Sequence, residues 1–157
     1  MPVKLGRKPS ASKSPGRSKG KKLLTFLNYG GNCEQAFRFY ESNLGGKITM
    51  MMKHGELPDQ SQVSPERRNA VLHARLELGG TELLGSDVPP EHFQPIRSAY
   101  LYLRVESVAE AERLYALLSD AGQVFMPLAE TFFAFRFVML RDKFGTSWAL
   151  IDERPPG

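Results

Sequence analysis

The sequence has a single cysteine and no long apolar stretch. Cys33 rules out an intramolecular disulfide, and it has no second cysteine or nearby histidine with which to build a structural zinc site. No apolar run approaches the roughly 20 residues that a membrane-spanning helix needs, and the first residues lack the apolar segment of a secretory signal. These absences predict a cytoplasmic protein without a membrane partner.

Acidic residues are missing from residues 1–22, which hold eight Lys/Arg. The remainder, residues 23–157, has 13 Lys/Arg against 17 Asp/Glu, a net charge of −4. Because Pro, Gly and Ser leave residues 1–22 little to bury, we expect a disordered basic tail. The tail has no aromatic side chains to stack on bases and the rest of the chain is acidic, which argues against a nucleic-acid partner. An interaction module that makes contact through this tail is the alternative.

Two stretches of the chain share one layout. Residues 24–46 and 99–122 each read as a short strand followed by a helix, and a shift of 75 places Tyr40 on Tyr115. Three strand-like stretches follow each helix, and the last two of each set meet at a glycine turn. The repeat predicts an α+β fold of two βαβββ modules, residues 23–87 and 98–153, in one domain over residues 23–153. The predicted strands after the helices are Lys47–Lys53, Ala70–Leu78, Thr81–Ser86, Gln123–Met126, Ala134–Leu140 and Thr146–Ile151.

Polar residues mark the start of both predicted helices. Ser107 with Glu110 forms a capping box for the second helix, and Asn32 with Gln35 is predicted to do the same for the first. Gly45 follows the first helix, where a left-handed residue would end it.

Alternation along the predicted strands separates an apolar face from a polar one. His73 and Tyr100 fall on polar faces, together with Tyr102. In the strand from Ala134 to Leu140, we predict that Phe135, Phe137 and Met139 pack on the helix, which places Arg136 on the opposite face. A polar face of this kind can simply meet water. The aromatic residues favour a partly closed cleft, because binding clefts are mostly apolar with a few polar groups. The aromatic candidates are Tyr100, Tyr102, Phe132 and Phe133.

Three residues are candidates for catalysis. His73 is a potential base or metal ligand, although a structural role is at least as well supported. Glu82 and Glu130 are the carboxylates nearest the predicted cleft, but their spacing demonstrates no catalytic pair.

The segments "FYESNLGG", "LHARLELGGTELLGSD" and "MPLAETFFAFRFVMLRDKFGTSWAL", in the order of the doubled βαβββ plan, resemble the vicinal oxygen chelate superfamily. This superfamily includes glyoxalase I, bleomycin resistance proteins and extradiol dioxygenases, and the chain is most similar to its PhnB-like branch. The resemblance covers residues 23–153. It implies curled mixed sheets around a cleft, helices on the outside and a homodimer.

The resemblance also implies where a metal would bind. In metal-dependent members four ligands come from the first and last strands of the two modules. Carried over, these positions fall on Thr25, Leu84, Tyr100 and Ala149, and none of the four is His, Glu or Asp. Leu and Ala cannot bind a metal at all, so no cofactor is expected. Some PhnB-like members have methyltransferase-like names, but Gly30–Gly31 is only a weak match to a nucleotide-binding loop.

These observations lead to two functional hypotheses. The first is a metal-independent protein that binds a small organic ligand. Its ligand-binding residues would be Thr25, His73, Tyr100, Tyr102, Phe132, Phe133 and Arg136. In this hypothesis Arg136 forms an ion pair with an anionic group of the ligand. The second is a metal-dependent lyase or dioxygenase-like enzyme with a divalent metal at a relocated site, where His73, Glu82 or Glu130 act as ligands or bases.

Overall fold

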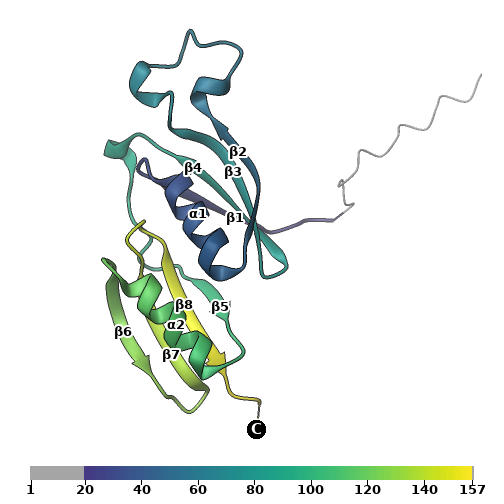
Figure 1. Cartoon of the computed structure of the whole chain (residues 1–157), viewed down its shortest axis with the longest axis vertical. Helices are drawn as coiled ribbons and strands as arrows, with labels where there is room; N and C mark the ends of the chain where they lie inside the picture. The colour runs from purple at the N-terminus through teal and green to yellow at the C-terminus, as the bar shows by residue number, and fades with distance from the viewer. Residues whose placement is uncertain (1–19, 157) are drawn as a thin grey trace, which may run out of the picture.

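The computed structural model describes residues 20–156, and its elements repeat one order twice (Figure 1). Residues 1–19, which hold most of the predicted basic tail, lie outside the described residues. Three short 3₁₀ turns, η1 (His54–Glu56), η2 (Pro65–Arg67) and η3 (Pro90–His92), lie outside the repeated elements. The first module comprises β1 (Thr25–Tyr29), α1 (Cys33–Leu44), β2 (Lys47–Lys53), β3 (Val71–Leu78) and β4 (Thr81–Asp87), and the second comprises β5 (Leu101–Arg104), α2 (Val108–Ser119), β6 (Gln123–Ala129), β7 (Ala134–Arg141) and β8 (Ser147–Glu153).

Each module forms one mixed four-stranded sheet. The strand orders are β1-β4-β3-β2 and β5-β8-β7-β6, in which the first pair of each sheet is parallel and the other pairs are antiparallel. The modules lie one above the other along the long axis, with both helices on the viewer's side of the sheets (Figure 1). The predicted α+β fold of two βαβββ modules is therefore confirmed, while the two sheets stay open and do not close around a common cleft.

The local sequence explains most element ends. Gly79 and Gly80, both at positive φ, form the two-residue hairpin turn between β3 and β4. Gly45 ends α1 in the left-handed conformation at φ 75°. The Ser107 side chain accepts a hydrogen bond from Glu110 N at 3.1 Å, so the predicted cap of α2 is confirmed. Over the described part of the chain, no helix combines the length and apolar character needed to cross a membrane.

The predicted cap of α1 is wrong. The Asn32 side chain makes no capping hydrogen bond, and its Oδ1 is buried without a partner. Asp87, at the end of β4, takes its place: Oδ1 accepts from Gly31 N at 3.1 Å and from Cys33 N at 3.0 Å. Asp87, which is distant in the sequence, thus caps α1 in place of the adjacent Asn32.

One apolar core runs through both modules. It joins Tyr29 and Tyr40 of the first module to Trp148 of the second, all at most 1% exposed. At the junction, the hydroxyl groups of Tyr29 and Tyr40 each lie 2.9 Å from Thr146 Oγ1. Arg113 of α2 also donates to the backbone oxygen of Asn43 at the end of α1. These contacts fix the position of the modules relative to each other.

Candidate functional site

Each sheet has one face covered by its helix and one face without a helix, which we call the open face. On sheet β1-β4-β3-β2, the register places Phe26, Leu84, Arg75 and Met50 in one row across the open face. Phe26 is 53% exposed and Met50 42%. Large apolar side chains that are this exposed on one sheet face are typical of a surface that binds a ligand or another protein.

His73 lies on the same open face, and its placement there agrees with the prediction. Its Nε2 accepts a hydrogen bond from Arg75 Nε at 3.3 Å, while Arg75 Nη1 lies 3.6 Å from Glu82 Oε2. The three side chains form a chain of polar contacts between β3 and β4. The structure therefore brings together His73 and Glu82, two of the three candidate catalytic residues, through contacts of both with Arg75.

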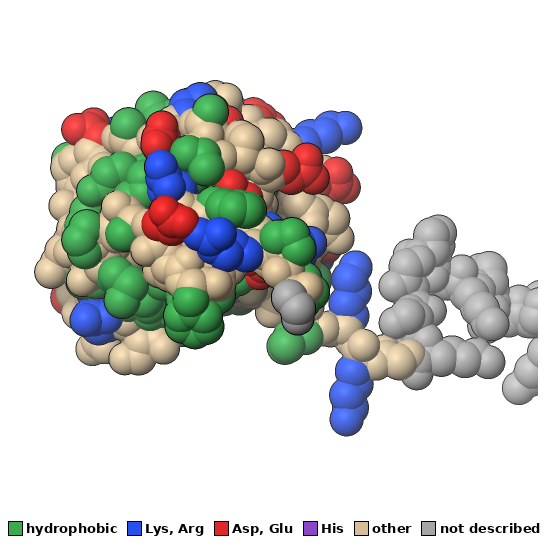
Figure 2. Space-filling model, turned by 90° about the horizontal axis from the view of Figure 1, so that it is seen from below, with side chains coloured by type: hydrophobic (Ala, Val, Ile, Leu, Met, Phe, Trp, Pro, Cys, Tyr) green, Lys and Arg blue, Asp and Glu red, His purple; other side chains and the backbone are tan. Residues whose placement is uncertain are grey.

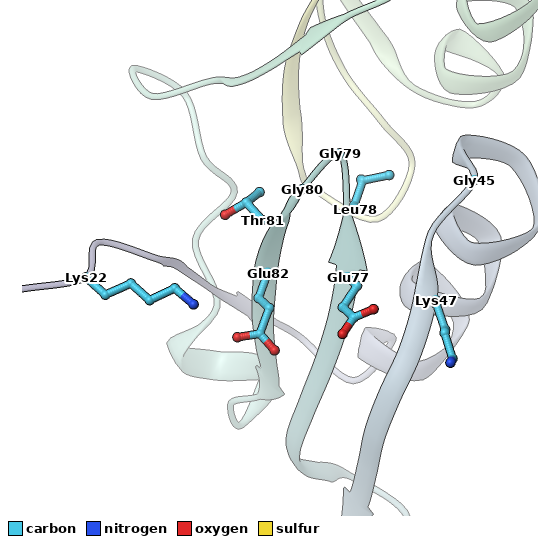
Figure 3. A pocket seen from close by; sticks show the side chains of 9 residues that line it. All are labelled: Lys22, Gly45, Lys47, Glu77, Leu78, Gly79, Gly80, Thr81 and Glu82. Atoms are coloured by element: carbon cyan, nitrogen blue, oxygen red, sulfur yellow. The ribbon is translucent and has the colours of Figure 1, made fainter. Parts of the chain in front are cut away.

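A hollow of about 540 Å³ lies at the turn end of this sheet. Glu77 and Glu82 stand opposite each other in the register of β3 and β4, and Figure 3 shows their carboxylates side by side between the side chains of Lys22 and Lys47. The lysines and Arg75 surround the two carboxylates with positive charge. Mixed charges of this kind suit a solvated surface better than an apolar binding cleft.

The open face of sheet β5-β8-β7-β6 changes character from row to row. Ala149 pairs with Tyr102 on one side and with Met139 on the other, and Met139 pairs with Met126. This row is apolar apart from the phenol oxygen. The next row, Arg104, Ile151 and Phe137, is also mainly apolar. Ala149 and Ile151 at the centre of the rows are 6% and 1% exposed, so a small organic molecule would contact mainly the side chains that flank them, such as Tyr102 and Met139.

Tyr102 is held at the edge of this surface. Its hydroxyl donates to the carboxylate of Glu153, whose other oxygen lies 3.4 Å from Arg104 Nη1. Desolvation and the bond to Glu153 raise the pKa of Tyr102 to about 12. The phenol is therefore neutral at physiological pH, and its role is that of a hydrogen-bonding group.

A groove of about 500 Å³ separates the edge strands β1 and β5. It gathers three of the predicted ligand-binding residues, Thr25, Tyr100 and Tyr102, beside the apolar side chains of Leu83 and Leu103. His73 is not among the residues that line this groove. The predicted set is thus divided, because three of its members line the groove whereas His73 lies on the open face of the first sheet.

The predicted orientation of Arg136 is wrong. Arg136 Nε lies 3.6 Å from Glu112 Oε1 of α2, so the arginine is on the helix side of β7. Val138 and Leu140, which share its alternation, are fully buried, whereas Phe137 faces the open side. The prediction exchanged the two faces of β7, because the aromatic residues that it placed against the helix occupy the face that lacks a helix.

The remaining predicted residues lie at the lower end of the second module. Phe132 is 93% exposed, and its ring packs on Phe133, which in turn packs on Phe137. Glu130 forms an ion pair with Arg154. The face seen from below carries apolar, acidic and basic side chains side by side (Figure 2).

The residues present do not fit the metal site that the superfamily implies. Leu84 and Ala149 carry no donor atom on their side chains, and Thr25 and Tyr100 are weak ligands for zinc or iron. Among residues 20–156, no group of three or more His, Cys, Asp or Glu could hold a metal ion. No step of a reaction can therefore be derived through a metal from these side chains.

Gly30–Gly31 does not form an open anion-binding loop. The amides of Gly31 and Cys33 at the start of α1 already donate to Asp87, whose second oxygen accepts from Val71 N at 2.9 Å. The carboxylate of Asp87 therefore occupies the place that the carboxylate or phosphate of a cofactor would need.

Sequence reasoning missed a cluster of cationic and aromatic side chains. Arg97, Arg141 and Phe125 meet at the end of the open face of sheet β5-β8-β7-β6, next to Tyr100. The only signal in the sequence was that Arg141 continues the alternation of β7. The position of Arg97 in the segment between the modules gave no signal at all.

Three similar proteins place the chain among known relatives. It is 29% identical to the protein YjdN of Escherichia coli over 136 residues, covering 82% of this chain and 92% of YjdN. The solved structure of protein PA1353 from Pseudomonas aeruginosa is 35% identical with a TM-score of 0.76, covering 87% of this chain and all of that one. The PhnB protein from Bacillus cereus is 28% identical with a TM-score of 0.72, covering 83% and 98%.

The fold itself extends to more distant proteins. A glyoxylase/bleomycin resistance protein/dioxygenase domain from Frankia sp. matches with a TM-score of 0.54 at 18% identity, over 88% of this chain and 99% of that one. The family model for 3-demethylubiquinone-9 3-methyltransferase matches residues 21–151. The chain therefore belongs to this PhnB-like family, and it has the fold of the glyoxylase/bleomycin resistance protein/dioxygenase domain.

Proposed function

We propose that the protein binds a small organic ligand on the apolar rows of its open sheet faces, without the metal that the superfamily commonly uses. The observation that carries this proposal is the row of Tyr102, Ala149 and Met139, which is apolar and has no helix over it. Two of the four positions that hold the metal in other members, Leu84 and Ala149, lack donor atoms altogether. Apolar contact and hydrogen bonding are the means of recognition that these residues provide.

The proposed site is completed by a second copy of the chain. In the described residues the two sheets are open, and their uncovered faces expose Phe26, Met50 and Tyr102. Exposed apolar surface of this kind favours association, and a homodimer would cover one open face with another. The ligand would then lie between two sheets, as the mostly apolar, concave form of binding sites requires.

Methyl transfer, which the family description names, finds less support in this chain. The amides at a helix N-terminus would be the binding site for the carboxylate of a methyl donor that carries an amino-acid group. The amides at the start of α1 are occupied by Asp87, which carries the same charge as that carboxylate. The apolar body of a ligand on the apolar rows needs no amide at a helix start.

Binding can be measured by nuclear magnetic resonance titration of the full chain with benzyl alcohol, a neutral aromatic probe. Met139→Lys places a charge in the middle of the apolar row, and we expect it to weaken binding at least tenfold, or about 1.4 kcal/mol. Ala116→Lys, on the exposed side of α2, is the matched control and should leave binding unchanged. Equal binding in the two variants would contradict the proposal.

Elemental analysis of the purified protein provides an independent test. We expect no stoichiometric divalent metal. A stoichiometric metal that is lost in His73→Ala would instead support the alternative, a metal-dependent enzyme with a relocated site that includes His73 and its neighbour Glu82.

A further inference from the structure

The segment between the modules is fastened to the end of the second sheet. Ile96 N donates to Gly145 O at 3.4 Å, and Ile96 O accepts from Arg141 Nε at 3.1 Å and from Ser147 Oγ at 2.5 Å. These bonds fix the backbone directly before Arg97. The position of the Arg97 side chain is therefore set by the sheet, although the residue belongs to a connecting segment.

Two guanidinium groups converge on one aromatic ring at this point. The Cζ atom of Arg97 lies 3.9 Å from the centroid of the Phe125 ring, and the Cζ atom of Arg141 lies 5.3 Å from it. Tyr100 packs edge-on against the same ring, at a centroid distance of 6.4 Å. Stacking on Phe125 and the bonds to neighbouring oxygens hold both arginines in place, which reduces the entropy lost when they bind a ligand.

The two arginines have no carboxylate partner among the residues that the structure describes. Seven other basic side chains in the same range form ion pairs, but Arg97 and Arg141 do not. Arg97 donates only from Nη1, to Tyr100 Oη at 2.8 Å, and Arg141 only from Nε. Two like charges thus contact one aromatic ring with most of their donors unused, an arrangement that an anion would stabilise.

Tyr100 adds a third donor. Its hydroxyl oxygen accepts from Arg97, so its own proton is available to an incoming acceptor. Leu101 of β5 pairs with Trp148 of the parallel strand β8, so Tyr100, one residue earlier, lies beside Ser147. Ser147 in turn pairs with Arg141 of β7. A polar row therefore borders the apolar row of Tyr102, Ala149 and Met139.

From this arrangement we infer that Arg97, Arg141 and Tyr100 form an oxyanion subsite, and that the ligand is a small organic acid. The acidic group lies against the two guanidinium groups, and the apolar body of the ligand lies over the neighbouring row. The inference rests on the proposed function and specifies its ligand class. It moves the anionic contact from Arg136, which is occupied by Glu112 on the helix side, to a pair of arginines on the open face.

The test is a titration of the full chain with benzoate, benzyl alcohol and inorganic phosphate. Wild-type protein should bind benzoate at least tenfold more tightly than benzyl alcohol, and salt should weaken the benzoate interaction. Arg97→Met and Arg141→Met each keep an apolar stem and should weaken benzoate binding at least tenfold, with benzyl alcohol unaffected. Arg136→Met is the matched control and should bind benzoate as wild type does. Thermal unfolding of each variant establishes that it is folded.

The outcomes separate the subsite from the proposed function. Benzoate binding that survives in Arg141→Met, or equal affinity for benzoate and benzyl alcohol, overturns the subsite and leaves the apolar site standing. Phosphate binding that is lost in Arg141→Met, with no binding of either aromatic probe, supports the subsite but contradicts an organic ligand on the apolar rows. If none of the three binds at about 20 mM, where even a Kd in the millimolar range would be detected, the subsite is overturned.

Discussion

At the scale of single residues, Asp142 gathers four hydrogen bonds at the junction of the modules. One oxygen accepts from the amides of Phe144 and Thr146, and the other accepts from Tyr40 Oη at 2.5 Å and Trp148 Nε1 at 2.9 Å. Burial raises the pKa of Asp142 above its ordinary value, because the four donors offset only part of the lost hydration. The carboxylate links α1 to the turn between β7 and β8.

We therefore expect Asp142→Asn to lower the free energy of unfolding by about 1–3 kcal/mol, since the new amide nitrogen cannot accept from Trp148. Urea denaturation followed by far-ultraviolet circular dichroism measures the change. Asp120→Asn, on an exposed carboxylate after α2, is the control and should shift stability by less than about 0.5 kcal/mol. Similar stability of the two variants would show that the network contributes little.

At the scale of elements, the start of α1 depends on a residue 54 positions away in the sequence. Asp87 satisfies the amides of Gly31 and Cys33 and also binds Val71 N of β3. One carboxylate thereby connects α1, β3 and β4. Asn32, which occupies the N-cap position, contributes no side-chain hydrogen bond.

This difference predicts the order of two alanine variants. Asp87→Ala leaves three backbone amides without their acceptor and should lower the free energy of unfolding by more than about 2 kcal/mol. Asn32→Ala removes a side-chain oxygen that is already unsatisfied, and its effect should be smaller than the roughly 1 kcal/mol of an ordinary N-cap loss. Calorimetric unfolding of both variants gives the order, and a greater loss in Asn32→Ala would contradict the assigned cap.

At the scale of the whole molecule, the main feature is the contrast between the two sides of each sheet. The helix sides share one continuous core, which joins the modules through Tyr40 and Trp148. The open sides have no covering element in the described chain, and they expose large apolar side chains in rows. The proposed dimer would bury these rows and place the Arg97 and Arg141 subsite at the edge of the covered surface.

For the dimer we predict that wild-type protein sediments as a dimer at micromolar concentration. Phe26→Lys, on the edge strand of an open face, should shift the population toward monomer, because a charge must then be buried or the contact given up. Ala116→Lys, on the exposed side of α2, should sediment as wild type does. A monomeric wild-type protein, or an unchanged dimer in Phe26→Lys, would contradict the proposed association.

The sequence by itself determined the doubled βαβββ order and most of the strand bounds, because these follow from local periodicity, turn residues and caps. The superfamily was indicated separately, by the resemblance of whole segments to known proteins. It also assigned His73, Tyr100 and Tyr102 correctly to open faces, where the alternation of polar and apolar residues was clear. Arg136 was misassigned because both faces of β7 are apolar, and only contact with α2 settles which face is covered.

Tertiary structure alone decided the remaining features. Asp87 reaches the start of α1, and Arg97 reaches the ring of Phe125, through contacts between segments that are distant in the sequence. No local pattern records such contacts, since they depend on how the sheets and the segment between the modules pack. For the same physical reason, the arginine pair proposed to bind the ligand became visible only in the folded chain.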